Sequence, residues 1–289
     1  MDNTTNQSFD KAFSLLYGKE LAIDPSIGMG YLAQFIHALE TGTMAFEKTK
    51  GIELITTAGV ITTADLKENI DNRVEAVPKG SVVKLYLNDY MSVNGGLCSL
   101  GVKDLADNLL SFKSNPNVSG AIIEVNSGGG EAMAGQIMFN AIKDFKKPVV
   151  ALVHNAGSAA YLAIAGVKEI IASGNLSRVG SIGAFVSLDR KFIAQYKERF
   201  QDIYADGSGD KNAAIRSFIE TGDTELIRAS LNETVQAFQE IVLNHRPIKK
   251  QEETLRGAMF PALDSKKRGL VDAIGTEDFA LKRLKVYTN

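Results

Sequence analysis

The sequence predicts an α/β fold in which most strands of the sheet are parallel. From residue 81 onward, strand-like apolar runs alternate with helix-like runs, as in repeated strand–helix–strand units. The run at 120–126 is apolar almost throughout, which indicates a strand that is buried on both faces. Functional residues in parallel sheets collect at the carboxyl ends of the strands, so we expect the site at that edge.

Each element of the predicted domain has its own pattern. Strands are predicted at 81–89, 120–126, 148–154, 168–173 and, shorter, at 201–205; helices are predicted at 101–115, 131–145 and 224–245. The last helix carries an apolar face formed by Leu226, Ile227, Leu231, Val235, Phe238, Ile241 and Val242. Short helices are expected in the tail. Apolar residues at helical spacing near the start predict an N-terminal helical accessory region, residues 1–75, ahead of a main domain at 76–289.

Composition excludes several classes of function. The 289 residues are 45% hydrophobic and 23% charged, which is ordinary for a globular protein that buries its own core. A net charge of -2 gives no basic surface, so we expect no nucleic-acid partner. One cysteine, Cys98, excludes an internal disulfide and fits a reducing compartment. Without an 18-residue apolar run or a secretory pattern, we expect no membrane span and a cytoplasmic location.

Ser158 stands at the turn between a strand and a helix rich in small residues. A serine there lies at the positive end of the helix, beside free amides that can bind a developing negative charge. Serine is also a favoured helix cap, so its position alone fits a structural role as well. The glycines at 128–130 follow the preceding strand. Their spacing fits no dinucleotide or phosphate loop, and we interpret them as part of an oxyanion hole, with a tight turn as the structural alternative.

A serine nucleophile needs a general base. Among the three histidines, His154 lies four residues before Ser158, but the set gives a Ser-His-Asp triad little support. Lysine is the alternative, and it acts as a base where burial or a nearby cation lowers its pKa. Lys211 follows a Gly-Ser-Gly loop and precedes small residues, whereas Lys191 and Lys197 lie in a helix with a surface pattern. Lys211 is therefore the favoured base, and His154 stays open.

Five segments in order resemble one serine peptidase family, which includes bacterial signal peptide peptidase A and the head-maturation proteases of tailed phages. They are NPNVSGAIIEVNSGGGEAMAG, NAGSAAYLAIAGVKEIIAS, VGSIGAF, IYADGSGDKN and GLVDAIGT. The resemblance covers roughly residues 80–275. It implies a Clp-protease/crotonase-like fold, which is a repeated β-β-α superhelix with a mostly parallel sheet.

The same resemblance implies a Ser-Lys dyad. Ser158 would be the nucleophile, Lys211 the general base, and the amides of Gly129 and Ala159 the oxyanion hole. The reaction would pass through an acyl-enzyme and need neither a metal nor an organic cofactor. Because members of the family form rings or stacks, the resemblance also implies a homo-oligomer whose sites are shared between subunits.

The favoured role is a phage or prophage capsid maturation protease that cleaves scaffold and head proteins. Three alternatives remain open. The first is a protease like signal peptide peptidase that degrades peptides. The second is a crotonase-like acyl-CoA enzyme, for which Glu131 is the nearest candidate base. The third is a non-catalytic assembly protein.

Overall fold

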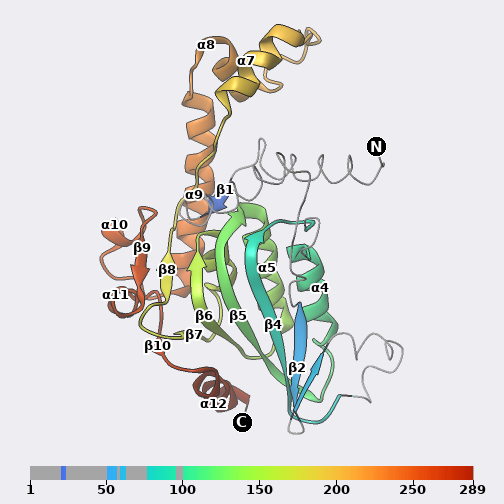
Figure 1. Ribbon diagram of the computed structural model, residues 1–289, viewed down its shortest axis with the longest axis vertical. Helices are drawn as coiled ribbons and strands as arrows, with labels where there is room; N and C mark the ends of the chain where they lie inside the picture. The colour runs from blue at the N-terminus through green and yellow to red at the C-terminus, as the bar shows by residue number, and fades with distance from the viewer. Residues whose placement is uncertain (1–20, 24–50, 57–58, 63–76, 96–99, 289) are drawn as a thin grey trace, which may run out of the picture.

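A computed structural model describes residues 21–23, 51–56, 59–62, 77–95 and 100–288 of the chain (Figure 1). Its strands form one sheet in the order β10-β7-β6-β5-β4-β2-β3. The parallel strands are β4 (Ser81–Met91), β5 (Val118–Glu131), β6 (Val149–Gly157), β7 (Glu169–Ala172) and β10 (Ala273–Ile274). The predicted α/β class with a mostly parallel sheet is confirmed.

The remaining strands extend this sheet at its edges. The antiparallel hairpin of β2 (Ile52–Thr56) and β3 (Gly59–Thr62) pairs with β4. Near the end of β6, β8 (Arg178–Gly180) adds in parallel and carries β9 (Met259–Pro261) antiparallel. β1 (Leu21–Ile23) pairs antiparallel with the end of β5.

Helices pack on both faces of the sheet. α4 (Val102–Ser111), α5 (Ala132–Phe145) and α6 (Ala159–Ile164) lie on one face, and α12 (Glu277–Thr288) lies on the other. The other described helices are α7 (Arg190–Arg199), α8 (Ala213–Thr221), α9 (Glu225–His245), α10 (Gln251–Thr254) and α11 (Ala262–Arg268). Because side chains alternate along a strand, Ile123 of β5 faces the large core beneath α4, α5 and α6, while Ile122 faces a smaller core beneath α12. We call the sheet and its packed helices the body.

The structure places most predicted elements where the pattern indicated and corrects others. Predicted strands 81–89, 120–126, 148–154 and 168–173 are β4 to β7, and the three longer predicted helices are α4, α5 and α9. The strand predicted at 201–205 is wrong, because that segment has no regular structure. The tight turn that was the structural alternative for the glycines at 128–130 is not formed, because β5 continues through them.

The N-terminal region is described only in part. Its predicted helices lie outside the described residues. Residues 52–56 and 59–62, for which no strand was predicted, form the antiparallel pair β2 and β3 of the main sheet. The division between an accessory region at 1–75 and a domain at 76–289 stays a prediction.

Residues 190–237 project from the body, and we call this segment the arm (Figure 1). It comprises α7, α8 and the first half of α9. Every arm residue whose burial is described is at least partly exposed. Of the apolar face predicted for α9, only Phe238 and Val242 are buried, and both lie beyond the arm. The arm therefore has no core of its own.

Candidate active site

Ser158 occupies a strained turn between β6 and α6. Its backbone has φ +52° and ψ −118°, a conformation that residues other than glycine rarely adopt. The turn is fixed from both sides, because the Ser158 amide donates to the Gly180 carbonyl at 2.9 Å and its carbonyl accepts from the Leu162 amide at 2.9 Å. A strained serine between a strand and a helix is also how α/β-hydrolases present their nucleophile.

The hydroxyl of Ser158 makes no contact with a general base among the described residues. The residue is 1% exposed, and its Oγ donates to the carbonyl oxygen of Gly183 at 3.3 Å. A carbonyl oxygen accepts this hydrogen bond but does not take up a proton at neutral pH. The described chain thus holds a positioned serine without its activating partner.

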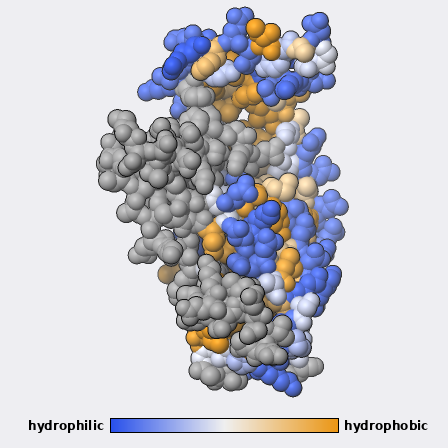
Figure 2. Space-filling model, turned by 90° about the vertical axis from the view of Figure 1, so that its right-hand side faces the viewer, coloured by the Kyte–Doolittle hydropathy of each residue, from blue (hydrophilic) through white to orange (hydrophobic). Residues whose placement is uncertain are grey.

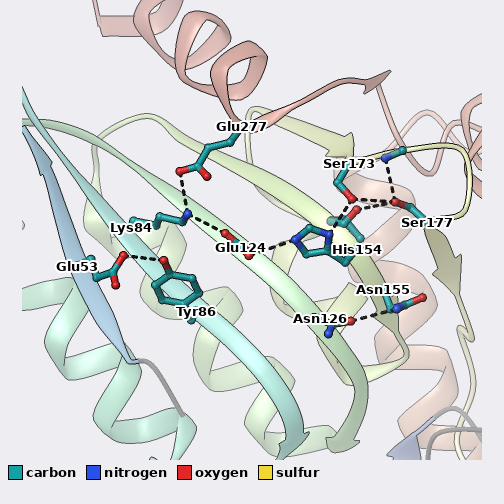
Figure 3. Close-up of polar contacts among 12 residues, drawn as sticks. Glu53, Lys84, Tyr86, Glu124, Asn126, His154, Asn155, Ser173, Ser177 and Glu277 are labelled. Carbon is teal, nitrogen blue, oxygen red and sulfur yellow. Dashed lines mark hydrogen bonds and ion pairs between the residues drawn. The ribbon is translucent and has the colours of Figure 1, made fainter. Parts of the chain in front are cut away.

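His154 is engaged elsewhere (Figure 3). Its Nε2 lies 3.1 Å from Glu124 Oε1, and its Nδ1 lies 2.8 Å from Ser173 Oγ. Both ring nitrogens are therefore occupied by groups other than Ser158. The structure does not support His154 as the base.

Lysines inside the body fit the role of base no better. Lys84 Nζ lies 2.8 Å from Glu124 and 2.7 Å from Glu277 (Figure 3). Burial lowers the pKa of Lys84, but the hydrogen bonds to the two carboxylates outweigh it and raise the pKa overall. Burial lowers the pKa of Lys147, but Lys147 precedes β6 and lies at the opposite end of that strand from Ser158.

The glycines of β5 lie beside the Ser158 turn. A Cβ on Gly157 would come within 2.8 Å of the Gly128 carbonyl oxygen, so the two backbones are in close contact. Gly129 has φ +104°, and its amide donates to Ser127 Oγ at 3.1 Å. Ser127 Oγ donates in turn to the carbonyl of Asp89. The structure thus brings Gly129 to the site but pairs its amide internally in this state.

Ser127 is a positioning residue that the sequence analysis missed. It is 1% exposed. Its signal was its place two residues before Gly129, where a serine side chain can bond a backbone amide.

Ala159 follows Ser158 as the first residue of α6 and is fully buried. Its amide belongs to the first turn, where helix amides lack an intrahelical acceptor. α5 packs closely here, since a Cβ on Gly135 would lie 2.7 Å from the Ala159 carbonyl oxygen. Ser158, Ala159 and Gly129 are therefore brought together as the sequence predicted.

The segment GLVDAIGT holds α6 in place. Tyr161 is fully buried, and its hydroxyl donates to the Leu270 carbonyl at 2.9 Å. Burial raises the pKa of Tyr161, so the hydroxyl remains a neutral donor. Asp272 accepts from Arg246 Nη2 at 2.6 Å and from the Ile170 amide at 2.8 Å. The contact of this motif with Tyr161 thus helps to fix α6 and, with it, the turn at Ser158.

Lys211 lies in the arm, between α7 and α8, and is exposed. Its amide donates to the Ser208 carbonyl at 3.1 Å. It lines a cavity of about 240 Å³ together with Asn212 and residues between 202 and 208, whereas no residue of β6 or α6 lines that cavity. The described chain does not bring Lys211 and Ser158 into one pocket.

Other candidate chemistry is sparse in the described residues. Glu131 is buried, and its Oε2 accepts from the Val93 amide at 3.3 Å. Within the described ranges, no three His, Cys, Asp or Glu side chains are grouped so that they could hold a metal ion. None of the helices in the described part of the chain has the length and apolar character needed to cross a membrane.

Comparisons with known proteins agree on one family. The model of Peptidase family S49 matches residues 141–289, which include both Ser158 and Lys211. A candidate protease of Methanocaldococcus jannaschii is 32% identical over 191 residues, covering 63% of this chain and 60% of that protein. The chloroplastic serine protease SPPA of Arabidopsis thaliana is 27% identical over 195 residues, covering 63% of this chain and 28% of that protein.

The chain thus spans less than two thirds of the length of either relative. Among solved structures, it is similar to a ClpP1 mutant from Listeria monocytogenes, with a TM-score of 0.44 and 14% identity. That match covers 74% of this chain and 98% of the ClpP1 chain.

Proposed function

Because the chain belongs to peptidase family S49, we propose that it is a serine endopeptidase with Ser158 as its nucleophile. The observation that carries the proposal is the strained backbone of Ser158, at φ +52° and ψ −118°, beside the glycines of β5. A strained serine costs stability, which a purely structural cap would not require.

In the proposed reaction, Lys211 removes the proton from Ser158 as its Oγ attacks the scissile carbonyl. The amides of Gly129 and Ala159 bind the oxyanion, for which the Gly129 amide must leave Ser127. The lysine then protonates the leaving amine, and water hydrolyses the acyl-enzyme. This reaction needs no metal or organic cofactor.

We further propose that Lys211 reaches Ser158 of a neighbouring subunit in a homo-oligomer. The exposed apolar surface of the arm supports this arrangement (Figure 2). Phe200 is 59% exposed, Ile203 89% and Leu226 48%. Monomeric proteins rarely leave a contiguous apolar patch exposed, and a second copy of the chain would cover it.

For the biological role, we propose capsid maturation, in which the peptidase cleaves scaffold and head proteins. This role rests on the resemblance of the sequence motifs. Peptide degradation is the alternative, since the two relatives are named for protease activity alone. Cleavage of assembled scaffold and capsid precursors at a few fixed sites would support maturation. Cleavage of denatured proteins at many sites would support degradation.

The enzymatic proposal is tested by phosphonylation with a small fluorophosphonate and by cleavage of a denatured protein, both followed by mass spectrometry. We expect one adduct on Ser158, and we expect cleavage to fall by a factor of about 10³ or more in Ser158→Ala and in Lys211→Ala. Lys191→Ala, an exposed lysine of the same arm, is the matched control and should stay active. Cleavage retained by Ser158→Ala would contradict the assignment.

A further inference from the structure

β5 extends beyond the point at which β6 leaves the sheet. The pairing of the two strands ends at Ser127 and Ala156, and β6 itself ends at Gly157. β5 continues to Glu131 and keeps its pairing with β4 on the other side. The opposite backbone edge of residues 129–131 is therefore left open by β6, directly beside the nucleophile turn.

β1 of the same chain occupies this edge. Its three residues pair antiparallel with β5, in the register Leu21 with Glu131, Ala22 with Gly130 and Ile23 with Gly129. Addition of a strand to an open sheet edge is a common way for proteins to bind extended peptides. The antiparallel direction leads this segment from Glu131 toward Gly129 and the turn.

A peptide substrate would need the same backbone edge of residues 129–131 and the same direction, antiparallel to β5. Its acyl half must end with the scissile carbonyl beside Ser158 and the proposed oxyanion donor Gly129. A peptide that enters along Glu131 and runs toward Gly129 meets this requirement. One backbone edge pairs with one strand at a time, so β1 and this substrate exclude each other.

The pairing of β1 is suited to displacement. It is three residues long, and two of its partners are glycines, which offer no side chain for a cross-strand contact. A pairing this short offers few backbone hydrogen bonds, and the attachment of β1 to the same chain raises its local concentration. In this state the Gly129 amide is also paired with Ser127.

We propose that residues 21–23 form an inhibitory strand, which occupies the substrate edge of its own chain and is displaced by an extended peptide substrate. The inference rests on the proposed peptidase function. The site competes for backbone pairing, so its ligand class is an extended polypeptide that runs antiparallel to β5.

The test compares Ala22→Pro with Ala22→Ser in the full chain. Proline removes the backbone amide donor and disfavours strand pairing, whereas serine keeps the amide donor and can still pair as a strand. The readout is the rate at which the Ser158 hydroxyl is phosphonylated, with release of phenol, by a tripeptidyl diphenyl phosphonate, which needs the edge, and, with release of fluoride, by a small fluorophosphonate, which does not. We expect Ala22→Pro to speed only the peptidyl reaction, by about tenfold if the edge is open in about one molecule in ten.

A second measurement does not depend on catalysis. In Ser158→Ala chains, hydrogen exchange at the amides of residues 129–131 should be faster with Ala22→Pro than with Ala22→Ser. A synthetic peptide of residues 19–25 should slow this exchange. It should also slow the reaction of the Ala22→Pro chain with the peptidyl phosphonate.

The outcomes separate the two proposals. The inhibitory strand would be overturned if Ala22→Pro and Ala22→Ser react with the peptidyl phosphonate at equal rates. It would also be overturned if hydrogen exchange at residues 129–131 is the same in both. Either result would leave Ser158 reactive. Failure of Ser158 to react with either reagent in every variant would overturn the peptidase function itself, and the exchange measurement would still report whether β1 holds the edge.

Discussion

The body and the arm of this protein are built in opposite ways. In the body, Ser158 is 1% exposed, and its turn is fixed by backbone hydrogen bonds from β8 and α6. In the arm, every residue of described burial is at least partly exposed, Lys211 included. Ser158, the proposed nucleophile, is therefore positioned by the chain's own fold, whereas the proposed base is carried by a segment whose described residues are all at least partly exposed. This difference is the reason for proposing that one chain provides half of a site.

The strongest test of the body is Asp272→Ala. Arg246, whose side chain is 4% exposed, would lose its carboxylate partner at 2.6 Å. Leaving a buried guanidinium without its partner should lower the free energy of unfolding by about 3 kcal/mol, measured by urea denaturation. Asp144→Ala is the control, because the Lys146–Asp144 pair is exposed at both ends, and it should cost less than about 0.5 kcal/mol. Equal costs would contradict the picture of a body held by buried polar contacts.

A smaller effect is expected at Glu169, which binds α12 to β7. The Arg283 guanidinium donates to both carboxylate oxygens, and Tyr287 donates at 2.6 Å. The hydrogen bond from Arg283 lowers the pKa of Glu169 below its ordinary value of 4.5, although burial acts in the opposite direction.

A lowered pKa in the folded state adds stability above pH 4.5, and this stability is lost as the pH falls through the lowered value. Glu169→Gln should therefore be less stable than the wild type at neutral pH, and the difference should shrink in acid. Urea denaturation at a series of pH values measures this difference. A difference that stays constant down to about pH 3 would refute the role of the charge.

The smallest change in stability is expected in the arm. Leu226 is 48% exposed, so Leu226→Ala should change the free energy of unfolding of the monomer by less than about 0.5 kcal/mol. The same substitution at Leu109, which is fully buried in the body, should cost about 3 kcal/mol.

Assembly of the oligomer should be more sensitive to Leu226→Ala than to Leu109→Ala, the reverse of the order expected for stability. Leu226→Ala should weaken the oligomer in sedimentation velocity experiments, because Leu226 belongs to the apolar surface that a neighbour would cover. If Leu226→Ala destabilises the isolated chain as much as Leu109→Ala, Leu226 packs in a core of the arm, which would contradict the exposed arm described above.

The sequence was informative where local pattern decides structure. The strands β4 to β7 are apolar runs between helices, and the small residues around Ser158 predicted the turn between β6 and α6. The position of Gly129 near that turn also followed from chain order, because successive parallel strands end at the same edge.

Features that depend on distant partners could not be read from local pattern. The strands β2 and β3 are only five and four residues long, and their place is decided by the edge of β4 that β5 leaves unpaired. The glycines at 128–130 allowed a turn as a structural alternative, but they lie in β5, where Gly129 and Gly130 pair with both β4 and β1. A side chain at Gly130 would collide with the carbonyl of Met91.

The position of Lys211 relative to Ser158 is the clearest case. Sequence motifs named both residues, but no local signal tells where an arm without a core will lie. The described chain does not bring the two residues into one pocket, and we propose that a second copy does so.

Subunit complementation tests this central claim most directly. Ser158→Ala and Lys211→Ala chains, each inactive, are co-expressed with different affinity tags, and mixed oligomers are purified through both tags. If the dyad is shared between neighbours, the mixed oligomers should recover about a quarter of the wild-type peptidase activity or more. One interface in four of a random mixture joins an intact serine to an intact lysine, and the two tags remove the inactive single-variant oligomers. Mixed oligomers that form but remain inactive would contradict the shared site.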